Sequence, residues 1–137
     1  MSLARRFLPG ALCLLLAGWL LASHGDSERV RRAAQLGAAG DFRAAASEAG
    51  RVTRRPAAAQ AWELRGRALA GAHAFGASAD AYARAARFEP RDWTVRREYA
   101  SVLLALGRRA DAQRQMAAAL ALNPRQSLPP GFVAAAR

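Results

Sequence analysis

An internal repeat of 34 residues constrains the possible folds of this chain more than any other feature of its sequence. Residues 59–92 and residues 93–126 align at that spacing without a gap. The matched pairs are Gly66 with Ala100, Leu69 with Leu103, Ser78 with Ala112, Tyr82 with Met116, Ala85 with Ala119, and Pro90 with Pro124. A period of this length is typical of stacked helical units, which bury a continuous core only when neighbouring units pack together.

Small and large residues are distributed within each unit as a pair of closely packed antiparallel helices requires. Small residues stand where two helix axes must approach: Gly66, Ser78, Ala100 and Ala112. Larger apolar residues surround them and are expected to fill the space between the helices: Trp62, Leu69, Tyr82, Tyr99, Leu103 and Met116. Each aligned unit is therefore predicted to be one helix pair with a tightly packed seam.

A proline closes each unit, at Pro90 and at Pro124. The residue before a proline is disfavoured in helical conformation, so the second helix of each pair is predicted to end there. Alanine is the commonest residue and β-branched residues are scarce, which favours helix almost throughout. The sequence predicts an all-α protein without a sheet.

The pattern within the middle unit resembles the tetratricopeptide repeat. The residues that carry the resemblance are Trp62, Gly66, Leu69, Ser78, Tyr82, Ala85 and Pro90. The middle unit departs from the family at Arg65 and the last unit at Arg96, where apolar residues are usual. The resemblance implies a right-handed superhelical array of antiparallel helix pairs that binds proteins or peptides in a concave groove.

A third, degenerate unit precedes the two aligned ones. Gly40, Asp41 and Phe42 lead into an alanine-rich segment, as the second helix of many such repeats begins, and Pro56 closes the unit. The predicted organisation is three units at about residues 26–58, 59–92 and 93–125, followed by a tail at residues 126–137. One hydrophobic helix in residues 1–25 precedes them.

Residues 1–25 carry two arginines and then an uncharged run from residue 7 to residue 23, which is typical of a targeting segment. The run is short for a membrane span and long for a secretory core, so a retained signal anchor and a cleaved signal peptide both remain open. Trp19 and the poor cleavage site favour the anchor. We expect a single-pass membrane protein with a cytoplasmic N-terminus and the repeats outside the cytoplasm; otherwise the chain is secreted or periplasmic.

The net charge is +11, and every one of the 21 basic residues is arginine. Without residues 1–25, 19 arginines against 10 acids leave +9 on residues 26–137. This charge has two readings: a solvated arginine-rich surface, or an electrostatic binder of anionic lipid or nucleic acid. Acids are interleaved with the arginines and no aromatic platform accompanies them, which disfavours nucleic acid.

The resemblance places one set of residues in the groove: Gln60, Glu63, Arg67 and Ala70 in the middle unit, and Thr94, Arg97, Ser101 and Leu104 in the last. Arginines there, with Arg31 from the first unit, would make the groove electropositive and suited to an acidic partner. The alternative for Arg67 is a solvated helix surface paired with Glu63 at a spacing of four. The leading function is an adaptor or scaffold that binds a protein partner at the membrane or after export.

Catalysis is not expected. His24 and His73 have no carboxylate or second histidine at catalytic or metal-ligand spacing, and no glycine-rich phosphate loop occurs, so we expect no enzyme activity, cofactor or metal. The tail after residue 126 is too short for a capping helix. We therefore expect Leu128, Phe132 and Val133 to cover the bare face of the last helix around Met116 and Leu120, or oligomerisation to cover it.

Overall fold

The computed structural model describes residues 4–132, with the side chains of residues 16–22 and 24–132. It contains α1 (Ala4–Ala38), α2 (Phe42–Gly50), α3 (Ala57–Gly71), α4 (Phe75–Phe88), α5 (Trp93–Ala105) and α6 (Arg109–Leu122). No strand occurs in this described range. The predicted all-α class is confirmed.

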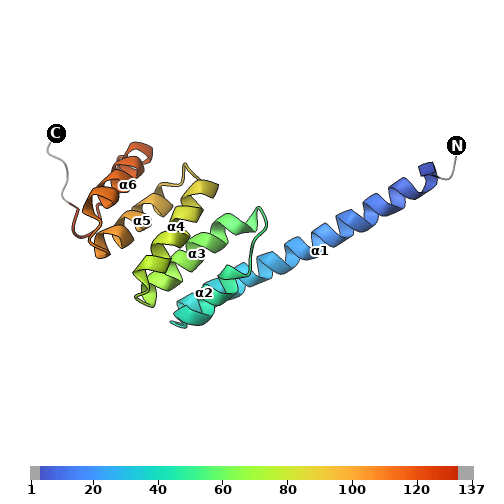
Figure 1. The fold of residues 1–137 in the computed structure, drawn as a ribbon, viewed down its shortest axis with the longest axis horizontal. Coiled ribbons are helices and arrows are strands. Elements are labelled where there is room, and N and C mark those ends of the chain that lie inside the picture. The colour runs from blue at the N-terminus through green and yellow to red at the C-terminus, as the bar shows by residue number, and fades with distance from the viewer. Residues whose placement is uncertain (1–3, 133–137) are drawn as a thin grey trace.

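Each helix packs mainly against its neighbours in sequence (Figure 1). Contacts between α3 and α4 and between α5 and α6 are the most extensive, and α1 packs on both α2 and α3. The N-terminal part of α1 extends away from the other helices as a single rod. The start of α1 and helix α6 consequently lie at opposite ends of the molecule.

The closest approach between α3 and α4 depends on a glycine. A Cβ atom at Gly66 would lie 2.9 Å from two ring carbons of Tyr82, so only a residue without a side chain fits there. The hydroxyl of Ser78, which is fully buried, donates a hydrogen bond of 2.7 Å to the carbonyl oxygen of Gly66. The small residues expected at this seam thus occupy the seam.

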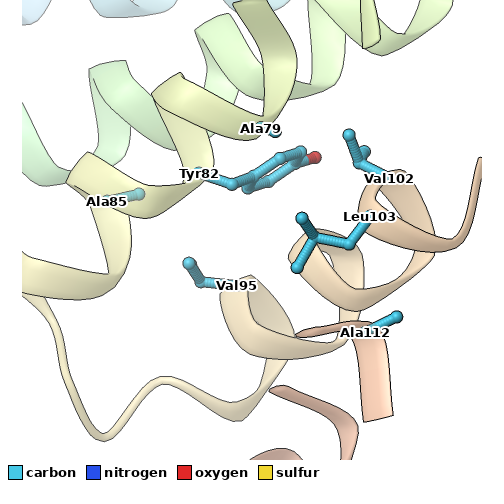
Figure 2. Packing of buried hydrophobic residues seen from close by; sticks show 7 residues of the cluster. All are labelled: Ala79, Tyr82, Ala85, Val95, Val102, Leu103 and Ala112. Carbon is cyan, nitrogen blue, oxygen red and sulfur yellow. The ribbon is translucent and has the colours of Figure 1, made fainter. Parts of the chain in front are cut away.

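The main core lies between α4, α5 and α6. The Tyr82 ring points from α4 toward Val102 and Leu103 of α5, and Val95 closes the same space (Figure 2). Ala112 brings α6 into the cluster, and Trp62 of α3 packs at its margin. Two smaller clusters pack α1 and α2 against α3. One comprises Val30, Val52 and Ala61, and the other comprises Ala45, Ala46 and Ala68.

Three turns between helices share one backbone conformation. Gly40, His73 and Gly107 each have positive φ, at 84°, 59° and 74°. In each turn the next residue's amide donates to the leucine carbonyl five residues earlier, at Leu36, Leu69 and Leu103. The α1–α2, α3–α4 and α5–α6 turns are therefore built alike.

The ends of α4 and α6 follow the prolines as predicted. Glu89 and Asn123, each directly before a proline, leave the helical region with φ of −129° and −139°. Asp41 caps α2 by accepting a hydrogen bond from the Ala44 amide, and Asp92 caps α5 through the amides of Thr94 and Val95. These caps satisfy amides that the first helical turn leaves without partners.

The predicted localisation is contradicted. Across the part of the chain that is described, no helix is both long and apolar enough to cross a membrane. The uncharged run of residues 7–23 continues without a break in α1 into Asp26, Glu28 and Arg29, and about 20 apolar residues are needed for a span. Cys13 lies among the residues whose side chains are not described.

The face of the last helix that was expected to need a cover is largely buried: Met116 is 3% exposed and Leu120 is half-buried. The tail folds back, and Phe132 packs against the main core, to which Ala112 of α6 belongs. The neighbouring Gly131 lies against the Leu104 side chain of α5. Val133 lies outside the described residues.

Candidate functional site

An apolar cavity lies where α1, α2 and α3 meet. Its volume is 260 Å³, and small or apolar side chains make up most of its wall. The residues that line it are Ala33, Ala34, Gly37, Ala38, Phe42, Leu64, Arg67 and Ala68. Arg67 is the one charged residue in this wall, and its side chain is 60% exposed. The cavity therefore combines an apolar surface with a single guanidinium.

Phe42 lines this cavity and packs against the end of α3. A Cβ atom at Gly71 would lie 2.8 Å from the Phe42 ring, so the ring rests on the α3 backbone. The aromatic residue that starts α2 is thereby pressed against the end of α3. This contact joins the first helix pair to the second and gives the cavity a rigid boundary.

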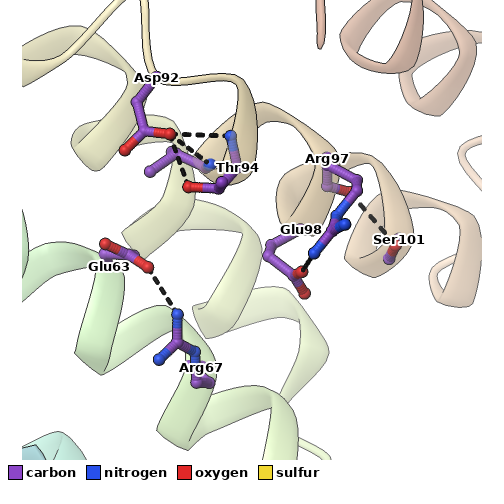
Figure 3. Close-up of polar contacts among 8 residues, drawn as sticks. Glu63, Arg67, Asp92, Thr94, Arg97, Glu98 and Ser101 are labelled. Carbon is purple, nitrogen blue, oxygen red and sulfur yellow. Dashed lines mark hydrogen bonds and ion pairs between the residues drawn. The ribbon is translucent and has the colours of Figure 1, made fainter. Parts of the chain in front are cut away.

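Arg67 is already paired in the structure. Its guanidinium donates to the Glu63 carboxylate at 2.6 Å, one helical turn away on α3 (Figure 3). Burial raises the pKa of Glu63, and Arg67 opposes that rise. The negative charges of Asp92, Glu89 and Glu98 raise it further.

Acidic groups from two places thus act on the Glu63 carboxylate: Glu89 and Asp92 between α4 and α5, and Glu98 on α5 itself. The two arginines predicted to make the groove electropositive in this region are each paired with a carboxylate, Arg67 with Glu63 and Arg97 with Glu98. Burial also raises the pKa of the Tyr82 hydroxyl, with Glu98 adding to the rise and Arg67 opposing it. Tyr82 therefore stays protonated and serves packing.

Three of the four predicted groove residues of α5 form local interactions, and the fourth, Leu104, packs against the main core. Asp92 accepts hydrogen bonds from both the amide and the hydroxyl of Thr94, at 2.8 Å and 2.6 Å. Ser101 donates to the carbonyl oxygen of Arg97 one turn earlier. Thr94 and Ser101 thus use their hydroxyls to hold α5 itself.

Arg97 is half-buried and lies over the ring of Trp93 at 5.3 Å while pairing with Glu98 at 3.0 Å. Gln60 is exposed and lines a separate cavity of 220 Å³ with Pro56 and Val30. Of the eight predicted groove residues, Arg67 alone borders the apolar cavity. The structure therefore does not bring the eight together around that cavity.

The residues of α1 that line the cavity were missed by the sequence reasoning. Aligning the first unit with the middle unit at a spacing of 33 residues, and not 34, would have found them. At that spacing Leu36 matches Leu69, and Gly40 matches His73. At that spacing Ala34 falls opposite Arg67. Arg31, which was expected in the groove, instead pairs with Glu28 and lines a different cavity.

The departure at Arg65 has a structural explanation. Its guanidinium lies 5.2 Å from the centre of the Trp62 ring, and that of Arg84 lies 4.6 Å from the same ring. Arg65 also contacts the backbone at Gly50, where a Cβ atom would lie 3.0 Å from its Nη1. The aliphatic stem and flat head of arginine replace the apolar residue that the repeat pattern favours.

Comparisons of the chain with protein-family models and with curated proteins each found no match.

Proposed function

We propose that this chain is a non-enzymatic adaptor built from three tetratricopeptide-like helix pairs, which binds a segment of another protein in the cavity between α1 and α3. The binding surface comprises Ala34, Ala38, Leu64 and Arg67. The apolar cavity with one guanidinium at its wall is the observation that carries the proposal.

The repeated turns support the array. Gly40, His73 and Gly107 share positive φ and the same pattern of backbone hydrogen bonds. Such turns return each second helix along the first, and consecutive pairs contact each other through α2 with α3 and α4 with α5. A right-handed superhelix of three units, at about residues 26–58, 59–92 and 93–125, accounts for these contacts and for the repeat.

The chemistry of the cavity defines the partner. Ala34, Ala38 and Leu64 offer apolar contact to one side chain of a bound segment. A carboxylate next to that side chain can accept hydrogen bonds from Arg67, in competition with Glu63. The expected partner motif is thus an aliphatic residue with an adjacent acidic residue.

Selection of peptides from a random displayed library tests this proposal. Peptides enriched on the wild-type chain are synthesised, and their dissociation constants are measured by fluorescence anisotropy. The Ala34→Trp variant fills the cavity from its solvent side, since Ala34 is exposed. We expect it to weaken binding by at least about tenfold, the effect of losing one buried aliphatic contact.

Ala77→Trp is the matched control, because Ala77 is also exposed but lies on α4 outside the cavity. It should bind the selected peptides as the wild type does. The Arg67→Gln variant should lose preference for peptides with the acidic residue while still binding the apolar part. Enrichment of no peptide, or equal binding by Ala34→Trp and wild type, would refute the proposal.

A further inference from the structure

A second cavity, separate from the apolar cavity between α1 and α3, is lined mainly by charged residues. It lies between α1 and α2, has a volume of 470 Å³ and is lined by Gly25, Glu28, Arg29, Arg31, Arg32, Gln35, Glu48 and Arg51. A neighbouring cavity of 290 Å³ shares Gly25, Arg29 and Arg51 with it and adds Asp26 and Arg54. The two cavities adjoin at these three shared residues and are here together called the arginine cleft.

The charges of the arginine cleft do not cancel. Five arginines face three carboxylates, those of Asp26, Glu28 and Glu48, which leaves an excess of two positive charges. Arg31 pairs with Glu28, and Arg51 pairs with Glu48 at 2.9 Å. These two pairs account for two of the carboxylates.

The remaining arginines have little internal bonding. Arg29 reaches Asp26 only at 4.0 Å and the carbonyl oxygen of Arg51 only at 3.5 Å. Neither Arg32 nor Arg54 has an ion pair or a side-chain hydrogen bond within the described part of the chain. The donor groups of three arginines are thus available in a concave space.

From this arrangement we propose that the arginine cleft binds a phosphate group in the larger cavity through Arg29 and Arg32, with Arg54 adding positive charge from the adjoining cavity. A phosphate monoester carries nearly two negative charges near neutral pH, which matches the excess. Its three terminal oxygens accept hydrogen bonds from several guanidinium forks at once, whereas a carboxylate has only two oxygens. This site is separate from the apolar cavity and does not depend on the proposed adaptor function.

Two probes distinguish the sources of the phosphate. Binding of inorganic phosphate to the full chain is followed by calorimetry. Binding to phosphatidylcholine vesicles with phosphatidic acid is followed by sedimentation, against vesicles of phosphatidylcholine alone. Saturable binding of inorganic phosphate identifies a soluble ligand, and binding that needs phosphatidic acid identifies a lipid headgroup.

Whichever probe the wild type binds, inorganic phosphate or phosphatidic acid vesicles, the Arg29→Gln/Arg32→Gln variant should bind it at least about tenfold more weakly. The variant loses two charge-assisted contacts. Arg91→Gln/Arg125→Gln removes the same charge from exposed positions outside the cleft and should bind as the wild type does. Circular dichroism checks the folding of both variants. Arg54→Gln, outside any helix, tests the cleft again if the first variant does not fold.

Failure of the wild type to bind either probe would overturn the proposal. So would an equal loss in the cleft variant and its charge-matched control, since that result assigns binding to the diffuse charge of the chain. Neither result would affect the peptide measurements, because they concern a different surface.

Discussion

At the scale of single residues, the ion pair of Glu63 and Arg67 determines the charge on α3 next to the apolar cavity. Glu63 is half-buried, and Arg67 compensates its charge only in part, so the pKa of Glu63 is raised. A carboxyl group whose pKa is higher in the folded state binds protons more readily there than in the unfolded state. Its contribution to the free energy of unfolding must therefore fall as pH rises from its unfolded pKa to its folded pKa.

The Glu63→Gln variant removes this titration. Near pH 4 both proteins carry a neutral side chain at this position and should have similar stability. As pH rises above the ordinary glutamate value of 4.5, the wild type bears the cost of a desolvated charge and the variant does not. We expect the variant to become the more stable protein by neutral pH, as measured by urea unfolding at a series of pH values.

A stability difference between Glu63→Gln and wild type that is constant with pH would contradict this reasoning. A difference of the opposite sign at neutral pH would show instead that the pair with Arg67 outweighs the desolvation of Glu63.

At the scale of helices, the sequence predicted the seams better than the boundaries. The small residue at Gly66 and the prolines after Glu89 and Asn123 act locally, so their consequences can be read from the sequence. A separate hydrophobic helix was predicted within residues 1–25, yet α1 continues without a break through Gly25 to Ala38. A single glycine costs only about 1 kcal/mol in a helix, which good helix formers on either side offset.

The residues that line the apolar cavity were harder to predict, because they depend on how separate helices pack. Thr94 and Ser101 have the spacing of groove residues, but short hydroxyl side chains readily bond to nearby backbone and capping groups. Ala34 and Ala38 carry no polar group to attract notice, and their role follows only from how α1 lies against α3. Packing of separate helices, rather than local spacing, determines which residues line the cavity.

The seam between α3 and α4 yields a direct test. Gly66→Ala should lower the free energy of unfolding by about 1 to 3 kcal/mol, because the new methyl group overlaps the buried Tyr82 ring. Gly76→Ala, on α4 with open space around its Cβ, should raise it by about 0.5 to 1 kcal/mol through helix propensity. Urea unfolding of both variants measures the difference, and stabilisation by both would show that the seam tolerates a side chain.

At the scale of the whole molecule, the core is unevenly distributed. The main cluster joins α4, α5 and α6 around Tyr82 and Leu103, while α1 and α2 depend on Val30, Val52 and several alanines. The shortest helix, α2, has nine residues. Because most contacts join helices that are adjacent in the sequence, we expect local stability to differ along the chain.

We therefore expect the first helix pair to open before the rest of the molecule. Native-state hydrogen exchange should show faster exchange for amides in α2 than for amides in α4 and α5. Val52→Ala, which trims a buried contact of the first pair, should accelerate exchange in α2 and leave α5 unchanged. Leu103→Ala should destabilise α4, α5 and α6 by about 2 to 5 kcal/mol. If both variants instead accelerated amide exchange equally in all helices, the molecule would be a single cooperative unit. The small clusters around α2 would then be strongly coupled to the main core.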